Sequence, residues 1–145
     1  MVQGGIALTK KLVFPSEEWI AEYWKLLNAN TAYKDAAKDW EGAFLFVIEA
    51  DGKVIKENMR LYMDLWHGEC RLARMALPDD KAPFVYAGPY ENWKQLFAGK
   101  IDPIKGIMAR KFKLTGDMGK VMRATKAAAE LVATAVKIPT KFLDE

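Results

Sequence analysis

The sequence holds one cysteine and one histidine in 145 residues, so the side chains that most often carry covalent or metal chemistry are nearly missing. Cys70 has no partner for an internal disulfide, which is typical of a protein from a reducing compartment. Zinc sites use three or four Cys, His or carboxylate ligands, and only one of each soft type is present. We therefore predict no metal and no cofactor.

Long apolar runs are missing as well. The longest, Ala43 to Ile48, is far short of the roughly 20 residues that cross a bilayer. Near the N-terminus, Lys10 and Lys11 follow a short apolar stretch, the reverse of a secretory signal, and residue 2 is not the glycine of a myristoylation site. The last residues, 142–145, do not form an Ala-Lys-Leu-type peroxisomal signal. We expect a cytoplasmic protein.

Motifs for catalysis or phosphate binding are weak. A catalytic Cys–His pair needs both side chains within about 3 Å and a third group to orient the base. The segment His67-Gly68-Glu69-Cys70 instead favours a turn between two strands. In Gly116-Asp117-Met118-Gly119-Lys120 only two residues separate the glycines and Val121 follows, so the spacing of a P-loop is absent. Anion binding by the backbone at this junction stays open.

Hydropathy patterns predict one α+β domain spanning residues 1–145. Ser16 and Asp102 are predicted to cap helices. Helical spacing predicts helices over residues 17–28, 31–40, 89–97, 103–109 and 117–136. Alternation predicts strands over residues 42–50, 53–65, 70–77, 84–87 and 111–114. We expect a five-stranded, largely antiparallel sheet covered by helices on one face.

The Asp51-Gly52 dipeptide predicts a two-residue hairpin turn between the first two of these strands. Ile48 then lies opposite Ile55, and Phe44 lies opposite Met59. One face of the hairpin collects the apolar side chains, interrupted by Glu57 opposite Phe46. Its members are Phe44, Phe46, Ile48, Ile55, Met59, Leu61, Met63 and Leu65. The stripe of the last helix is predicted as Met118, Val121, Met122, Thr125, Ala129 and Val132.

Charge is distributed unevenly along the chain. Residues 1–90 carry 11 basic and 13 acidic side chains, whereas residues 91–145 carry 11 basic and 6 acidic ones. A basic end can favour anionic partners such as phospholipid surfaces, acyl-CoA phosphates or nucleic acid, and also occurs as an ordinary solvated surface. The 111–114 strand lacks exposed aromatic residues for base stacking, because Phe112 shares a face with Leu114 and is expected to point inward. We predict no nucleic-acid binding, and transient contact with an anionic membrane surface.

Large, soft apolar side chains are abundant: seven methionines, five tryptophans and seven phenylalanines. Methionine adapts to cavities that accept varied ligands. A lipid site needs only an apolar cavity with a few polar groups at its mouth, so it leaves no short motif. An ordinary core explains the same composition, and both interpretations stay open.

Four stretches carry a family pattern. Two in the C-terminal half are Glu91-Asn92-Trp93-Lys94-Gln95-Leu96-Phe97-Ala98-Gly99-Lys100-Ile101-Asp102-Pro103 and Lys111-Phe112-Lys113-Leu114-Thr115-Gly116-Asp117. They resemble the sterol-carrier-protein type-two domain, with its Gly-Lys-Leu-Asp-Pro-like segment and its Lys-Leu-x-x-x-Gly-Asp-like strand end. Residues 14–19 and 36–42 look like the opening of microbial single-domain members. The resemblance implies a five-stranded sheet backed by helices around a hydrophobic tunnel for fatty acids, acyl-CoAs, sterols or phospholipids.

We therefore predict a non-enzymatic protein, monomer or homodimer, that binds and transfers a lipid or fatty acyl ligand. The predicted cavity residues are Phe44, Phe46, Met59, Leu61, Met63, Trp93, Phe97, Ile104, Met108 and Met122. Lys120 and Arg123 are the candidates for a head group. Two alternatives are a catalytically silent dimerisation module whose apolar face meets a partner, and an acyl-processing enzyme that uses His67 or Cys70.

Overall fold

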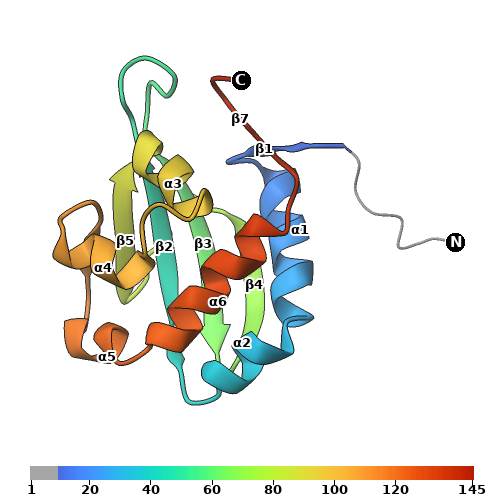
Figure 1. Ribbon diagram of the computed structural model, residues 1–145, viewed down its shortest axis with the longest axis vertical. Helices are drawn as coiled ribbons and strands as arrows, with labels where there is room; N and C mark the ends of the chain where they lie inside the picture. The colour runs from blue at the N-terminus through green and yellow to red at the C-terminus, as the bar shows by residue number, and fades with distance from the viewer. Residues whose placement is uncertain (1–9) are drawn as a thin grey trace, which may run out of the picture.

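A computed structural model describes residues 10–145, so the expectations for the first few residues lie outside the described part of the chain (Figure 1). The strands are β1 (Leu12–Phe14), β2 (Glu41–Glu49), β3 (Met59–Trp66), β4 (Glu69–Met75), β5 (Phe84–Pro89), β6 (Lys113–Thr115) and β7 (Thr140–Phe142). The helices are α1 (Glu17–Asn28), α2 (Thr31–Ala36), α3 (Tyr90–Phe97), α4 (Pro103–Met108), α5 (Met118–Met122) and α6 (Thr125–Val136).

The central sheet has five strands in the order β4-β3-β2-β5-β6. Only the β2–β5 pair is parallel, and the other pairs are antiparallel. The predicted α+β fold with a largely antiparallel five-stranded sheet is confirmed. The parallel pair arises because the chain passes from β3 through β4 and a loop before it returns as β5 beside β2.

Helices cover one face of this sheet: α3 and α6 cross in front of it in Figure 1, and α1 runs beside β4. The predicted caps are confirmed: Ser16 Oγ accepts the Trp19 N–H, and the Asp102 carboxylate accepts the N–H groups of Ile104 and Lys105. These caps satisfy backbone donors that the first helical turn leaves unpaired. No helix within residues 10–145 is long and apolar enough to cross a membrane.

A two-stranded parallel pair, β1 with β7, joins the two ends of the described chain and was not predicted. Each strand has three residues, too few for a period-two pattern to show in the sequence. Tyr90 holds the pair in place, because its hydroxyl donates to the Phe14 carbonyl and accepts the Leu143 N–H.

The predicted two-residue turn after β2 is wrong. Ile48 pairs with Met59 and Phe44 pairs with Met63, so residues 50–58 form a longer loop. The Asp51 carboxylate causes the difference, since it accepts the N–H groups of residues 53–55 and curls the chain before a tight hairpin can close. The register moves by an even number of residues, so the apolar face is kept. Glu57, expected on that face, lies exposed in the loop.

Two predicted helices also need correction. The helix expected over residues 31–40 ends at Ala36, because the chain turns through residues 37–39 to bring Trp40 against Phe44 and Phe84. The long helix expected over residues 117–136 is two helices, α5 and α6, separated by Arg123 and Ala124. The predicted stripe does not continue across this break, and Thr125 and Ala129 are exposed.

Candidate functional site

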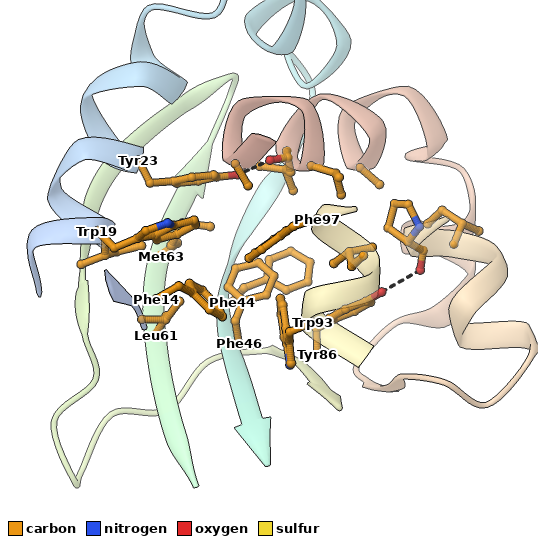
Figure 2. A pocket seen from close by; sticks show the side chains of 18 of the residues that line it. Phe14, Trp19, Tyr23, Phe44, Phe46, Leu61, Met63, Tyr86, Trp93 and Phe97 are labelled. Atoms are coloured by element: carbon orange, nitrogen blue, oxygen red, sulfur yellow. Dashed lines mark hydrogen bonds between the residues drawn. The ribbon is translucent and has the colours of Figure 1, made fainter. Parts of the chain in front are cut away.

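An apolar cavity of about 90 Å³ lies between the sheet and its helices (Figure 2). Strands β2, β3 and β5 contribute its floor, and all helices except α2 contribute to its walls. The lining residues are Phe14, Trp19, Ile20, Tyr23, Phe44, Phe46, Leu61, Met63, Tyr86, Trp93, Leu96, Phe97, Pro103, Ile104, Val121, Ala128, Leu131, Val132 and Ala135. The sheet and the helices therefore pack against each other around an unfilled space.

Every polar side-chain group in this lining already has a partner in the protein. Tyr23 Oη donates to the Leu131 carbonyl at 2.7 Å and Tyr86 Oη donates to the Pro103 carbonyl at 2.8 Å (Figure 2). The indole N–H of Trp19 donates to a threonine hydroxyl, and that of Trp93 donates to two backbone carbonyls. Burial raises the pKa of both tyrosines, so they stay neutral. The cavity thus offers a guest hydrocarbon and aromatic surface, and no unused hydrogen-bond donor.

A second void of about 40 Å³ lies next to the first. The two share the side chains of Phe44, Val121, Ala128 and Leu131 as common lining. Apolar cavities of about 150 Å³ hold a benzene molecule, so neither void alone holds an acyl chain. A long guest requires these shared side chains, two of them on α6, to move aside.

Seven of the ten predicted cavity residues line the larger void: Phe44, Phe46, Leu61, Met63, Trp93, Phe97 and Ile104. Figure 2 shows the sheet residues and the α3 aromatics converging from different elements. The other three lie elsewhere. Met59 is half-buried against the core at the start of β3, Met122 is half-buried on α5, and Met108 is 69% exposed.

The two predicted head-group residues flank Val121, which contributes to the wall from α5. Lys120 is occupied: its ammonium donates to the Glu41 carbonyl and lies 4.7 Å from the ring centroid of Trp40. Arg123 is exposed at the end of α5. Of the two, only the Arg123 guanidinium is turned to solvent.

No cavity residue was predicted on α1, and the predicted stripe on the α6 side was mis-phased. Trp19, Ile20 and Tyr23 of α1 line the void, and their helical spacing was visible. On α6 the lining residues are Ala128, Leu131, Val132 and Ala135. Their i, i+3, i+4, i+7 spacing is itself a helical stripe, and the assumption of one continuous helix concealed it.

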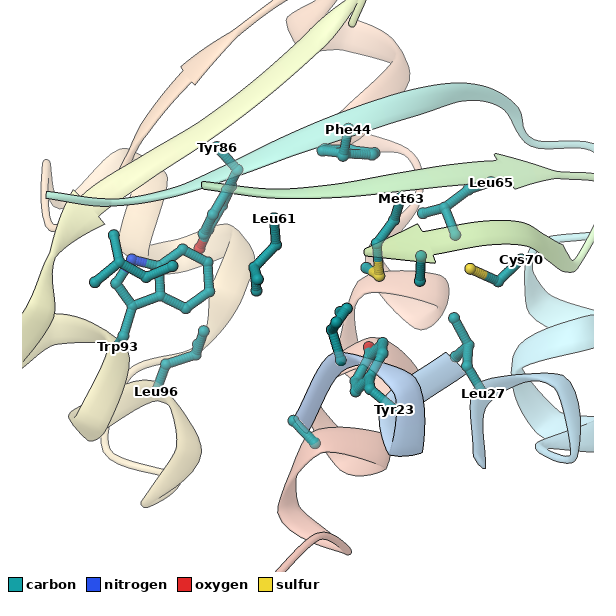
Figure 3. Close-up of a cluster of buried hydrophobic side chains, with 14 of the residues drawn as sticks. Tyr23, Leu27, Phe44, Leu61, Met63, Leu65, Cys70, Tyr86, Trp93 and Leu96 are labelled. Carbon is teal, nitrogen blue, oxygen red and sulfur yellow. The ribbon is translucent and has the colours of Figure 1, made fainter. Parts of the chain in front are cut away.

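The histidine and the cysteine make separate interactions. His67 Nε2 lies 2.6 Å from the Glu41 carboxylate, and this hydrogen bond raises the pKa of the imidazole. Cys70 is 2% exposed and its sulfur donates to the Leu72 carbonyl (Figure 3). Burial raises the pKa of the thiol to about 12, so it is not a thiolate near neutral pH. Within residues 10–145 no cluster of three or more His, Cys, Asp or Glu side chains could hold a metal ion.

Comparison with known proteins decides the family, since the model of the SCP-2 sterol transfer family matches residues 24–129. The chain belongs to the SCP-2 sterol transfer family. A crystal structure of sterol carrier protein 2 superposes with a TM-score of 0.79 at 30% identity, over 85% of this chain and 97% of that one. The solution structure of a Thermus thermophilus protein, described as a candidate sterol carrier protein, gives 0.79 at 29% identity, over 87% and 90%.

A longer protein matches part of this chain. Hydroxysteroid dehydrogenase-like protein 2 of Xenopus laevis is 26% identical over 100 residues, which are 69% of this chain and 22% of that protein. The SCP-2 family match and the two superpositions support lipid binding or transfer in general for this chain.

Proposed function

We propose that this protein is a non-enzymatic lipid carrier that holds the hydrocarbon of a flexible-chain lipid, a fatty acid or acyl derivative, in the cavity under α6. The observation that carries the proposal is the lining: each of its hydroxyl and indole groups is hydrogen-bonded within the protein. A polar guest would lose its hydrogen bonds to water and gain none in return. A hydrocarbon guest has no hydrogen bonds to lose.

The energetics favour an apolar guest. An empty void of this size costs roughly 2 kcal/mol, at about 24 cal/mol for each Å³. Burying a chain of about 14 methylenes contributes roughly 11 kcal/mol before the costs of ordering the chain and moving the walls. The remainder is consistent with affinity in the micromolar range or tighter.

The shape of the site favours a flexible chain over a rigid ring system. The two voids adjoin one another and share only a few side chains. A chain can thread past such side chains one methylene at a time, whereas fused rings need the full width at once. In a displacement assay, we expect a long-chain fatty acid to compete with a bound fluorescent fatty acid more strongly than a sterol does.

The test fills the cavity from α6. Ala128 lines both voids, so Ala128→Phe places a ring in the space that the chain requires. The matched control is Ala133→Phe, which lies further along the same helix and is exposed. We expect the affinity for a fluorescent fatty acid to fall at least tenfold in Ala128→Phe and to stay unchanged in Ala133→Phe.

Native mass spectrometry of freshly purified protein gives an independent readout, with a co-purified lipid expected as a mass adduct. Equal fatty-acid binding by the two phenylalanine variants would place the ligand elsewhere. Failure of the delipidated wild-type protein to bind any fatty acid would overturn the proposal.

The non-enzymatic part of the proposal rests on the separation of His67 and Cys70. A catalytic pair hydrogen-bonds nucleophile to base, whereas here each side chain has its own partner. We expect His67→Ala and Cys70→Ser to bind lipid as the wild type does.

The dimerisation alternative needs a free apolar face, and that face of the sheet packs against the helices of this chain. The cytoplasmic location stays a prediction.

A further inference from the structure

The α4–β6–α5 side of the molecule carries a surface that the cavity does not explain. We define the basic face as the exposed residues Lys105, Met108, Arg110, Lys111, Lys113 and Met118. Figure 1 shows α4 and α5 on the same side of the molecule. A groove of about 490 Å³ follows this side and is lined by four of the six, together with the end of β5 and Glu49 of β2.

The positive charge of this region is not neutralised. Between residues 100 and 126 the chain has eight basic residues and two acidic ones. Both acids, Asp102 and Asp117, direct their carboxylates to backbone N–H groups as helix caps. The salt bridges found within residues 10–145 involve none of these eight basic residues. All of the eight except Lys120 are exposed, so seven uncompensated charges face solvent.

Apolar side chains lie among these charges. Met108 is 69% exposed and Met118 is 43% exposed, and they extend from α4 and α5 respectively. A solvated surface gains nothing from two exposed methionines, whereas a lipid interface accepts both flexible apolar side chains and basic ones. Lysine side chains in this setting can also extend their ammonium groups to the phosphate level.

One backbone position is unfavourable for the residue it holds. Arg110 follows Ala109, the C-cap of α4, and has a φ of 61°, the left-handed conformation in which glycine is the usual residue. An arginine at this position makes the fold less stable than a glycine would, and it places a positive charge on the basic face.

The same short helices connect this surface to the cavity. Pro103 and Ile104 of α4 and Val121 of α5 line the void, while Met108 and Met118 extend outward from the same two helices. Helices of five and six residues have few internal hydrogen bonds and little stability of their own. A lipid that leaves the cavity between α4 and α5 would emerge at the basic face.

We propose that the basic face is the surface through which this protein contacts an anionic lipid bilayer, with Met108 and Met118 entering the interface. The proposal rests on the proposed lipid-carrier function and names the membrane charge and the docking surface. Charge complementarity selects the anionic bilayer, since each Lys or Arg near such a surface strengthens binding by about fivefold at low salt.

The test compares sedimentation of the full chain with phosphatidylcholine vesicles and with vesicles that also contain phosphatidylglycerol. We expect binding only to the anionic vesicles, and weaker binding as salt is raised. The double variant Lys111→Glu/Lys113→Glu should bind at least tenfold more weakly. The control Lys53→Glu/Lys56→Glu changes the net charge equally in the exposed 50–58 loop and should bind within twofold of wild type. Met108→Ser/Met118→Ser should weaken binding at high salt, where the apolar contribution dominates.

Equal losses in the two charge-reversal variants, or equal binding to neutral vesicles, would overturn the docking proposal. Tighter binding to a DNA oligonucleotide than to the anionic vesicles at the same salt would overturn it as well. Fluorescent fatty-acid affinity is measured on every variant and should not change. If the wild-type protein does not bind the fluorescent fatty acid, the lipid-carrier function is refuted. The vesicle experiment would still show whether the basic face binds an anionic bilayer.

Discussion

Asn28 shows how one side chain covers an edge of the sheet. Its amide donates to the Cys70 carbonyl and its side-chain carbonyl accepts the Cys70 N–H, both at 2.8 Å. The Trp24 indole donates to the same Cys70 carbonyl at 2.7 Å. A neighbouring strand would make this same pair of hydrogen bonds to β4. The asparagine side chain therefore takes the place of a strand at Cys70 on the outer edge of β4, and it keeps that position from pairing with another chain.

Asn28→Ala should lower the free energy of unfolding by about 1–3 kcal/mol, because the Cys70 N–H is left without its acceptor beneath α1. Urea denaturation measures the loss. Asn92→Ala serves as the control, since it removes one exposed hydrogen bond to the Lys111 carbonyl and should cost less. Equal losses in the two variants would show that the edge is held by packing instead.

The raised pKa of Cys70 makes stability depend on alkaline pH. The folded thiol keeps its proton to about pH 12, whereas an unfolded cysteine loses it near pH 8.5. The contribution of Cys70 is thus complete below about pH 8.5 and is lost above it, at up to roughly 1.4 kcal/mol for each pH unit. Between those two pH values, Cys70→Ala should lose less stability with rising pH than the wild type. A parallel decline in both proteins would contradict the assignment.

At the scale of elements, α6 decides the form of the cavity. Its Ala128, Leu131, Val132 and Ala135 stripe forms one wall, and Tyr23 of α1 hydrogen-bonds to its backbone. The break at Arg123 and Ala124 lets α6 lie at its own angle across the sheet instead of following α5. The α6 wall of the cavity therefore depends on a two-residue turn that the hydropathy pattern of the sequence does not predict.

Leu131→Ala should lower the free energy of unfolding by about 2–4 kcal/mol, because it enlarges an existing void. The same change removes a side chain shared by both voids, so the affinity for a long-chain fatty acid should rise relative to that for a short-chain one. Denaturation and a chain-length series of competitors measure the two effects. An unchanged chain-length preference would show that the two voids do not join when a ligand binds.

At the scale of the whole molecule, the cavity is smaller than its proposed guest. Under the proposed function, a long chain displaces the side chains that the two voids share, two of them on α6, and the hydrocarbon then fills space that was empty or newly opened. Because the guest binds only the folded chain, folding and binding are linked.

A long-chain fatty acid at about 100 times its dissociation constant should stabilise the fold by roughly 2.7 kcal/mol. For a domain of this size that is a rise in melting temperature of about 5–10 °C. Differential scanning calorimetry measures it, with Ala128→Phe as the control that should not respond. A ligand-independent melting temperature in the wild type would contradict occupation of the core.

The sequence alone was sufficient for the fold class, for the caps at Ser16 and Asp102 and for the inward face of β2 and β3. Each of these follows from local chemistry, because a side chain beside a helix start or an alternating strand pattern carries its own signal. The even shift of register kept that face, although the turn at Asp51 was wrong.

Only the tertiary structure decided the β1–β7 pair, the break between α5 and α6, the exposure of Met108 and the existence of the void. These features depend on the spatial distance between elements that lie far apart in the sequence. A solid core and a hollow one are built from the same apolar residues. Periodicity shows which side of an element faces inward, and the distance between the layers that meet there is set only by their packing.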